Sequence, residues 1–302
     1  MSDLINKIEK LKKEKNAVIL AHYYVNDEVQ AIADFVGDSY YLAKLATTVP
    51  EETIVFCGVL FMGESAKILN CKKTVVMPDS FADCPMAHMI DAEKIKEVRN
   101  QYDDLAVVCY VNSTAEIKAL SDVCVTSSNA VKIVQMFPQK NIFFIPDSNL
   151  GRHVASLIPE KNFIFHDGFC HVHTSIKKED VLKAKSLHPQ AKVLVHPECT
   201  LDVIELSDYV GSTSGIIDYA TSSEADTFII CTEGGILYEL GQKNPNKKFY
   251  LAGHKQFCPS MKRITLEKVV GVLENMENPI EMDETLRLEA GKALLKMLEL
   301  SQ

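Results

Sequence analysis

The chain has 302 residues, of which 47% are hydrophobic and 24% charged, as in soluble globular proteins with room for two or three small cores. Its formal net charge of −9 argues against non-specific nucleic-acid binding, which needs a basic surface, but a local pocket can still accept an anionic small molecule. No apolar run approaches the roughly 20 residues of a membrane span, and the charged amphipathic start lacks a signal-peptide core. We therefore expect a cytoplasmic protein that does not bind membranes.

The first part of the chain alternates helix-like and strand-like segments. The predicted elements are a helix over 3–14, a strand over 17–21, a helix over 26–36, a strand over 53–57, a loop-to-helix junction at 63–69, and a strand over 74–77. The helix over 26–36 is predicted from apolar residues at helical spacing, and Pro78 with Asp79 ends the last strand.

The same order of elements recurs twice more. The second set is a strand over 105–109, a helix over 114–120 capped near Ser113 or Thr114, strands over 123–125 and 142–145, a turn at Gly151 and a strand over 162–165. The third set is a strand over 193–195, a helix over 203–206, and strands over 209–211, 227–230 and 249–251. An amphipathic helical tail follows from residue 266 and is expected to pack on the body.

Polar residues recur at nearly one spacing in these three sets. Each set has a histidine or tyrosine after a short apolar run, a hydroxyl 17 positions later, and a cysteine further on: His22, Ser39 and Cys84; Tyr110, Ser127 and Cys170; His196, Thr213 and Cys258. The repeat of about 87 residues predicts three α/β units, each a small parallel sheet covered by helices. Their expected bounds are 15–100, 101–187 and 188–275, with a C-terminal helix over 276–302 packing on the body.

The repeated cysteines predict a metal centre. Nine cysteines, an odd number, argue against a disulfide framework, and Cys57, Cys109 and Cys231 in strand-like runs are expected to be core residues. Three thiolates from three units leave one position of a four-coordinate site open for substrate, which suits a single zinc ion or a four-iron cluster with one unligated iron.

Other polar residues near these positions predict acid–base chemistry and ligand binding. Glu198, two residues after His196, suits proton transfer provided that burial raises its pKa towards working pH. His171 and His173 follow Cys170 closely and could chelate zinc with it. The preferred interpretation is that one imidazole points into the cleft and the other is structural. The neutral donors around His22, Tyr110 and the hydroxyls suit a small carboxylate ligand, and no nucleotide fingerprint is present.

These residues resemble the quinolinate synthase family over essentially the whole chain. The resemblance rests on short matches in the family's order: Ala21-His-Tyr-Tyr24, Gly37-Asp-Ser39, Pro78-Asp79, Cys84-Pro-Met-Ala87, Tyr110-Val-Asn-Ser113, Pro146-Asp147, Asn149-Leu-Gly151, Cys170-His-Val-His173, His196-Pro-Glu-Cys199, Gly211-Ser-Thr-Ser-Gly215 and Cys258-Pro-Ser-Met261. It implies three Rossmann-like αβα units around a pseudo-threefold axis.

The resemblance also implies an activity. Family members are transferases that condense iminoaspartate with dihydroxyacetone phosphate to quinolinate, losing phosphate and water, in de novo NAD biosynthesis. Cys84, Cys170 and Cys258 would ligate one [4Fe-4S] cluster whose open iron is a Lewis acid. The implied substrate-binding residues are His22, Ser39, Tyr110, Val111, Asn112, Ser127, His196, Pro197, Glu198 and Thr213. Glu198 would be the acid/base group, with Tyr24 and His173 assisting with the triose phosphate.

One departure and three alternatives accompany this interpretation. Some family members carry a Cys-x-x-Cys-x-x-Cys run at the last ligand, whereas here only Cys258 is available, so no local disulfide switch is expected. The alternatives are a hydro-lyase of another small acid, an iron–sulfur sensor and a zinc-binding structural protein. Functional coupling to an L-aspartate oxidase or dehydrogenase, which would supply the imine, is a further expectation.

Overall fold

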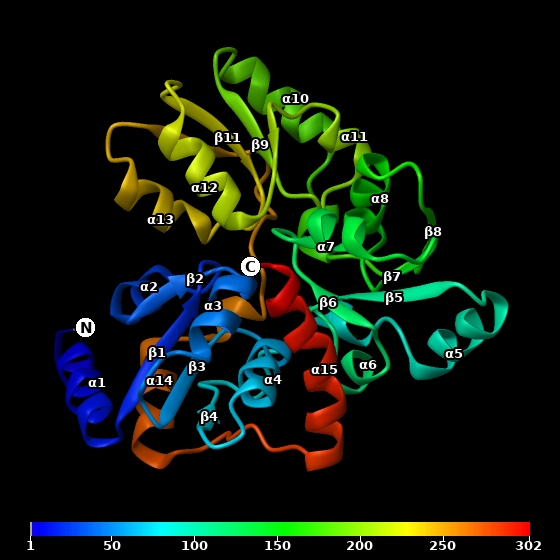
Figure 1. The fold of residues 1–302 in the computed structure, drawn as a ribbon. Helices are drawn as coiled ribbons and strands as arrows, with labels where there is room; N and C mark the ends of the chain where they lie inside the picture. Colours follow the sequence, from blue (N-terminus) through cyan, green and yellow to red (C-terminus); the bar gives the residue numbers. More distant parts are fainter. Residues whose placement is uncertain (1) are drawn as a thin grey trace.

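The structure, a computed structural model, describes residues 2–302 and contains three parallel four-stranded sheets with interleaved helices (Figure 1). The strand order is the same in all three: β2-β1-β3-β4, β6-β5-β7-β8 and β10-β9-β11-β12. Three Rossmann-like three-layer units around a pseudo-threefold axis were expected, and this repetition of one topology confirms that fold class.

The first sheet is formed by β1 (Ala17–His22), β2 (Phe35–Gly37), β3 (Thr53–Cys57) and β4 (Thr74–Val76). The helices of this part of the chain are α1 (Ser2–Glu14), α2 (Asp27–Ile32), α3 (Ser39–Ala46), α4 (Leu60–Leu69), the 3-10 helix η1 (Pro85–His88) and α5 (Ala92–Gln101). The helix predicted over 26–36 was too long. It ends at Ile32, because the backbone of Phe35 to Gly37 pairs with the end of β1 as an edge strand.

The second sheet is formed by β5 (Leu105–Tyr110), β6 (Val123–Val125), β7 (Asn141–Ile145) and β8 (Asn162–Phe165). Its helices are α6 (Ala115–Ala119), α7 (Ala130–Met136), α8 (Ser148–Leu157), α9 (His171–Thr174) and α10 (Lys178–Leu187). Thr114 is the N-cap residue of α6, one of the two positions predicted for it, although its side chain makes no capping hydrogen bond.

The third sheet is formed by β9 (Lys192–Val195), β10 (Tyr209–Val210), β11 (Thr227–Cys231) and β12 (Lys248–Leu251). The remaining helices are α11 (Leu201–Ile204), α12 (Thr213–Ser222), α13 (Ile236–Lys243), η2 (Met261–Arg263), α14 (Leu266–Asn275) and α15 (Glu284–Leu300). The helix predicted over 203–206 lies two residues earlier, as α11. Among residues 2–302, no helix combines the length and the apolar character that a membrane crossing needs.

Two glycines lie inside helices where a junction and a turn were predicted. Gly63 and Gly151 are the fourth residues of α4 and α8. A β-carbon on Gly151 would approach Phe144 to 2.9 Å, and one on Gly63 would approach Met77 to 2.7 Å. Close packing of each helix on its sheet therefore explains these glycines, and a loop conformation does not.

A carboxylate fixes the edge of each sheet in the same way. The N–H groups of Ile19, Val107 and Val193 donate to Asp34, Asp122 and Asp208 at 2.8, 2.6 and 2.8 Å. Each aspartate lies 15 residues after its donor, just before the second strand of its sheet. This contact aligns the first two strands, so that the polar residues after them reach the same edge.

The C-terminal helices bind the units together. α14 packs on α1 and β3, while α15 packs on α4, α6 and β6 and lies between the first and second units (Figure 1). The expected packing of the tail on the body is thus present. The largest hydrophobic cluster contains buried residues from all three sheets, and a smaller one belongs to α10, β9, β11 and their surroundings. The exact bounds of the three repeats stay a prediction.

Candidate active site

The carboxyl ends of the first strands of all three sheets meet at one pocket. His22 is the last residue of β1, Tyr110 is the last residue of β5, and His196 follows β9. The pocket also contains the three hydroxyl residues and the three cysteines of the repeat: Ser39, Ser127, Thr213, Cys84, Cys170 and Cys258. Repetition of one unit therefore brings together side chains that lie as far apart as 236 positions in the sequence.

Most of the predicted site residues line this pocket. Besides the repeated residues, Tyr24, Asn112, His173 and Glu198 do so. Val111 and Pro197 do not: Val111 lines a small hollow beside Ser39, and Pro197 lines a groove that also includes Ser127. Sequence reasoning missed several lining residues: Asp38, Val59, Phe61, Thr126, Val172, Glu233 and Met261. Asp38 and Glu233 had a signal, since both are acidic residues one or two positions beyond a strand end.

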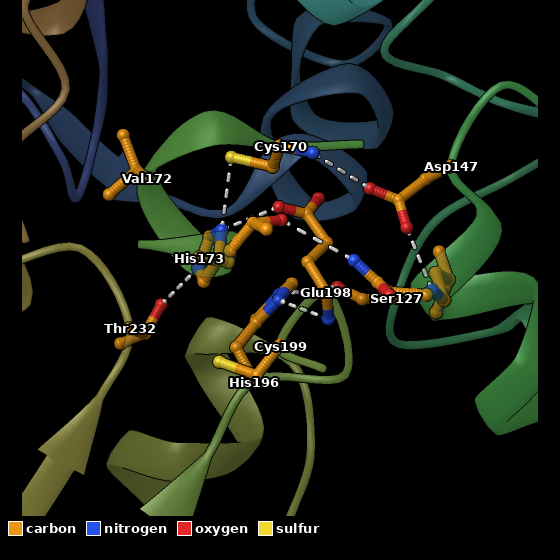
Figure 2. Close-up of polar contacts among 12 residues, drawn as sticks. Ser127, Asp147, Cys170, Val172, His173, His196, Glu198, Cys199 and Thr232 are labelled. Atoms are coloured by element: carbon orange, nitrogen blue, oxygen red, sulfur yellow. Dashed lines mark hydrogen bonds and ion pairs between the residues drawn. The ribbon is translucent and has the colours of Figure 1, made fainter. Parts of the chain in front are cut away.

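Glu198 lies at the centre of the buried polar network (Figure 2). Its Oε1 accepts a hydrogen bond from the Tyr110 hydroxyl at 2.5 Å, and its Oε2 lies 2.6 Å from His173 Nδ1. Burial alone would raise the pKa of Glu198, but the contact with His173, together with the nearby His196 and the Tyr110 hydrogen bond, outweighs burial and holds the pKa well below its usual range. The expected upward shift was wrong, and Glu198 is a carboxylate at neutral pH.

A chain of hydrogen bonds leads from His173 to the third unit. His173 Nε2 lies 2.9 Å from the Thr232 hydroxyl, which is 2.7 Å from the hydroxyl of Tyr24. The same Tyr24 hydroxyl is 2.7 Å from Thr213. Burial raises the pKa of Tyr24 well above its usual value, so this phenol keeps its proton and can pass one along the chain. Thr232 was not predicted from the sequence.

His22 and His196 are neutral in this environment. Burial lowers the pKa of each imidazole to about 3. Nδ1 of His22 accepts the N–H of Tyr24 at 3.2 Å, and Nδ1 of His196 accepts the N–H of Glu198 at 3.3 Å. With Nδ1 accepting, the proton is assigned to Nε2 of both rings, which aims an N–H donor at the pocket or, for His196, at Ser127.

The Asn112 carboxamide oxygen is buried and has no hydrogen-bond partner among residues 2–302. Buried acceptors of this kind are rare, because an unmet hydrogen bond costs about 1–3 kcal/mol. Asn112 lines the pocket, so a donor group on a bound ligand would satisfy this oxygen.

The three cysteines have the donor chemistry of an iron–sulfur site. Cys84, Cys170 and Cys258 are free thiols that line the same pocket. Burial, with the proximity of Cys258, raises the pKa of Cys84 to about 12, and burial raises the pKa of Cys170 and Cys258 as well. Such thiols ionise when a metal supplies the positive charge, so three soft donors, without a fourth cysteine among the residues that line the pocket, fit a cluster that keeps one iron free.

A second metal arrangement shares one of these cysteines. Ligand atoms of Cys170, His173 and Glu198 lie within 4.8 Å of one another. His173 Nδ1 is 3.2 Å from Cys170 Sγ, but the same nitrogen faces Glu198. One sulfur, one nitrogen and one oxygen would suit a single zinc ion, whereas only the three-cysteine set includes one residue from each unit.

Comparison with known proteins shows to which family this chain belongs. The family model described as quinolinate synthetase A protein matches residues 6–299. The chain belongs to the quinolinate synthetase A family. Proteins named quinolinate synthase are its relatives: that of Clostridioides difficile (strain 630) is 52% identical over 99% of both chains, and that of Caldicellulosiruptor saccharolyticus is 55% identical over 97% of both. That of Fusobacterium nucleatum subsp. nucleatum is 53% identical over 98% of this chain and 99% of its own.

Membership of the quinolinate synthetase A family confirms the resemblance found in the sequence motifs. Because the relatives align along nearly their whole length, the match includes all three sheets and the C-terminal helices. The names of these relatives support a quinolinate synthase function and a place in NAD biosynthesis for the chain.

Proposed function

We propose that this chain condenses iminoaspartate with dihydroxyacetone phosphate to form quinolinate, releasing phosphate and water. The observation that carries the proposal is the pocket itself, in which three cysteines, one from each unit, face the network of Glu198, His173 and Tyr110. A [4Fe-4S] cluster on Cys84, Cys170 and Cys258 would supply a Lewis-acidic iron. The enzyme is a transferase that forms a carbon–carbon bond and then dehydrates the product.

The neutral donors of the pocket would hold the dicarboxylate. They are the imidazoles of His22 and His196, the hydroxyls of Ser39, Ser127 and Thr213, the phenol of Tyr110 and the amide of Asn112. Because both imidazoles are neutral, they bind by donating hydrogen bonds rather than by charge. Val111 and Pro197 would shape the binding site from behind Ser39 and Ser127, with which they share neighbouring hollows.

Glu198 would act first as a base, because it is ionised before substrate binds. Its low pKa makes it a weak base in the empty pocket, and the negative charges of the bound dicarboxylate would raise that pKa towards working pH. It would take a proton from the triose phosphate and return it during dehydration, with His173 holding the carboxylate in place. Tyr24 lies three hydrogen bonds from Glu198 through Thr232 and His173, and its phenol would deliver or receive the proton at the far end of that chain.

Two measurements test this function. Anaerobically purified protein should contain about four irons and four sulfides per chain, and Cys84→Ser, Cys170→Ser and Cys258→Ser should each lose them. Glu198→Gln should keep the cluster and lose phosphate release and quinolinate formation. Zinc without sulfide, held by Cys170 and lost in His173→Ala, would instead identify the Cys170–His173–Glu198 arrangement.

The alternatives give different results in the same assays. A hydro-lyase of another small acid would share the cluster but release no phosphate from dihydroxyacetone phosphate. A sensor would lose its cluster reversibly without forming quinolinate. In the cell, we propose that the protein works in the cytoplasm and receives iminoaspartate from an L-aspartate oxidase or dehydrogenase, because a hydrolysable imine must be supplied close to its consumer.

A further inference from the structure

The backbone N–H of every cysteine in the three-cysteine set donates to a carboxyl oxygen. Cys84 donates to Asp83 Oδ1 at 2.7 Å, Cys170 donates to Asp147 Oδ2 at 3.2 Å, and Cys258 donates to Glu233 Oε1 at 3.0 Å. None of these carboxyl groups has a part in the proposed chemistry. Each unit thus has one carboxyl group that accepts a hydrogen bond from the backbone N–H of its cysteine. We therefore asked what this repeated contact does for a bound cluster.

Asp147 and Glu233 occupy equivalent positions and are almost fully buried. Each lies two residues beyond the third strand of its unit, β7 or β11, and their exposed fractions are 0% and 1%. The second oxygen of Asp147 accepts the N–H of Leu150 at 2.8 Å, and that of Glu233 accepts the N–H of Gly235 at 2.6 Å. Each carboxyl group therefore joins the start of a helix to the loop that carries the cysteine, as Figure 2 shows for Asp147 and Cys170.

In the first unit a different residue accepts the hydrogen bond from the cysteine N–H. The position two residues beyond β3 is Val59, which has no acceptor side chain. The N–H of Cys84 is instead bound by the adjacent Asp83, whose other oxygen lies 2.6 Å from His88 Nε2. The Asp83 side chain is 35% exposed, so this contact is weaker than the two buried ones. The first unit therefore has a carboxyl acceptor for its cysteine N–H although it has no acidic residue at the position of Asp147 and Glu233.

We propose that Asp83, Asp147 and Glu233 are positioning residues for the cluster. They hold the cysteine loops in the ligating conformation and keep the cysteine N–H groups away from the cluster sulfurs. Hydrogen bonds to sulfur raise the reduction potential of iron–sulfur clusters, so occupied N–H groups favour the oxidised form. A cluster that acts as a Lewis acid benefits from remaining in one oxidation state. The inference rests on the proposed function, in which these cysteines ligate a cluster.

The test separates the hydrogen bond from the charge of the carboxyl group. Glu233→Gln and Asp147→Asn keep one of the two acceptor oxygens, which can still meet the cysteine N–H, whereas Glu233→Ala and Asp147→Ala remove both. The midpoint potential of each reconstituted cluster is measured by an EPR-monitored titration, and iron loss to a chelator is timed in parallel. Glu205→Ala, an exposed carboxylate of the third unit, is the matched control.

We expect the alanine variants to show a higher potential, with about tenfold more reduced cluster at a fixed potential, which for one electron is about 59 mV. Iron loss should be about tenfold faster, since the loop that carries the cysteine loses a buried hydrogen bond that holds it in place. Glu205→Ala should match the wild type, and the amide variants, which keep one acceptor oxygen, should change less than the alanine variants. Asp83→Ala should show a smaller change than Glu233→Ala.

Two results would overturn the inference. One is a wild-type potential in Glu233→Ala and Asp147→Ala; the other is an equal shift in the amide and alanine variants, which would assign the effect to charge alone. If Asp147→Ala does not fold because α8 loses its cap, Glu233→Ala and Asp83→Ala decide the question. A wild-type protein that binds no cluster contradicts the proposed function instead, and so the two failures are distinguishable.

Discussion

Glu198 divides its carboxylate between two partners that come from the second unit, the Tyr110 hydroxyl and His173 Nδ1. A buried carboxylate without such partners would take up a proton. The two contacts therefore keep Glu198 charged, and they also orient it in a pocket where its other neighbours are neutral imidazoles. At this scale the reactivity of the site depends on the hydrogen bonds of a single side chain.

Tyr110→Phe should shift the acid limb of the pH–activity profile to higher pH. The substitution removes the 2.5 Å hydrogen bond that helps to lower the pKa of Glu198, so a larger fraction of the carboxylate is protonated at a given acidic pH. We expect kcat at neutral pH to fall about tenfold or more, the value of one charged hydrogen bond. Quinolinate formation measured from the lowest pH at which the protein stays folded up to pH 9 checks this. The control is Tyr102→Phe, outside the pocket; an unchanged profile in Tyr110→Phe would contradict the role of the contact.

His22 and His196 make the folded protein sensitive to acid. Their pKa values are about 3 in the folded state and 6.5 when unperturbed, so the unfolded chain binds more protons between these values. Their contribution to stability is complete above pH 6.5 and is lost as the pH falls towards 3, at about 1.4 kcal/mol per pH unit for each group.

Urea unfolding of the cluster-free protein at pH 7 and pH 5 measures this loss. His22→Gln should show a smaller decrease in the free energy of unfolding between the two pH values than the wild type does. His254→Gln, an exposed histidine, should leave the decrease unchanged. A wild-type decrease in His22→Gln would mean that this imidazole is already charged in the folded state.

The helices and strands of this chain could be predicted where a repeat or a pattern of apolar residues marks them. They were less predictable where tertiary packing determines the local structure. The three sheets and the pocket at their carboxyl ends followed from the threefold spacing of His22, Tyr110 and His196. Gly63 was read as a loop residue because glycine usually marks a turn, yet its lack of a β-carbon serves a helix lying on Met77. Val36 fitted a helical pattern, but an edge strand needs only a neighbour to pair with, here Ala21.

Contacts between side chains from different elements were the least predictable. The sequence marks Asp147 and Glu233 as acidic residues near strand ends, but it does not show that the cysteine N–H groups lie opposite them. Thr232 likewise connects His173 to Tyr24 only because β11 ends between them. Such contacts depend on how loops that follow different strands face each other, which the spacing of residues along the chain does not record.

Two helix glycines should respond in opposite ways to alanine. In Gly151→Ala of α8, the new β-carbon would lie 2.9 Å from Phe144 and 3.1 Å from Phe165, and Phe144 is fully buried. We expect the free energy of unfolding to fall by about 1–3 kcal/mol through overpacking. In Gly241→Ala of α13, nothing lies within 4 Å of the new β-carbon. The higher helix propensity of alanine should therefore raise the free energy of unfolding by about 0.5–1 kcal/mol. Chemical denaturation measures both, and equal signs would refute the packing argument for Gly151.

The three units form one body, because their buried residues belong largely to a single hydrophobic cluster and because α15 connects two of them. Ser301 at the end of α15 accepts a hydrogen bond from Asn129 of the second unit at 3.0 Å, while Arg287 near its start donates to the backbone oxygen of Ile68 in the first at 3.0 Å. The apolar stripe of the tail predicted that it packs, but not that it lies between two units. Since the pocket is formed by residues of all three, this connection also holds the site together.

Adjacent leucines of α15 provide the test of this connection. Leu294 is fully buried and lines the hollow shared by Ser39 and Val111, whereas Leu295 is 60% exposed. Leu294→Ala should lower the free energy of unfolding by about 2–5 kcal/mol and raise KM, because the cavity loosens the support behind Ser39. Leu295→Ala should change both values little, since surface substitutions usually cost within about 0.5 kcal/mol. Urea unfolding and steady-state kinetics measure the two values. An equally small change in Leu294→Ala and Leu295→Ala would show that α15 does not support the site.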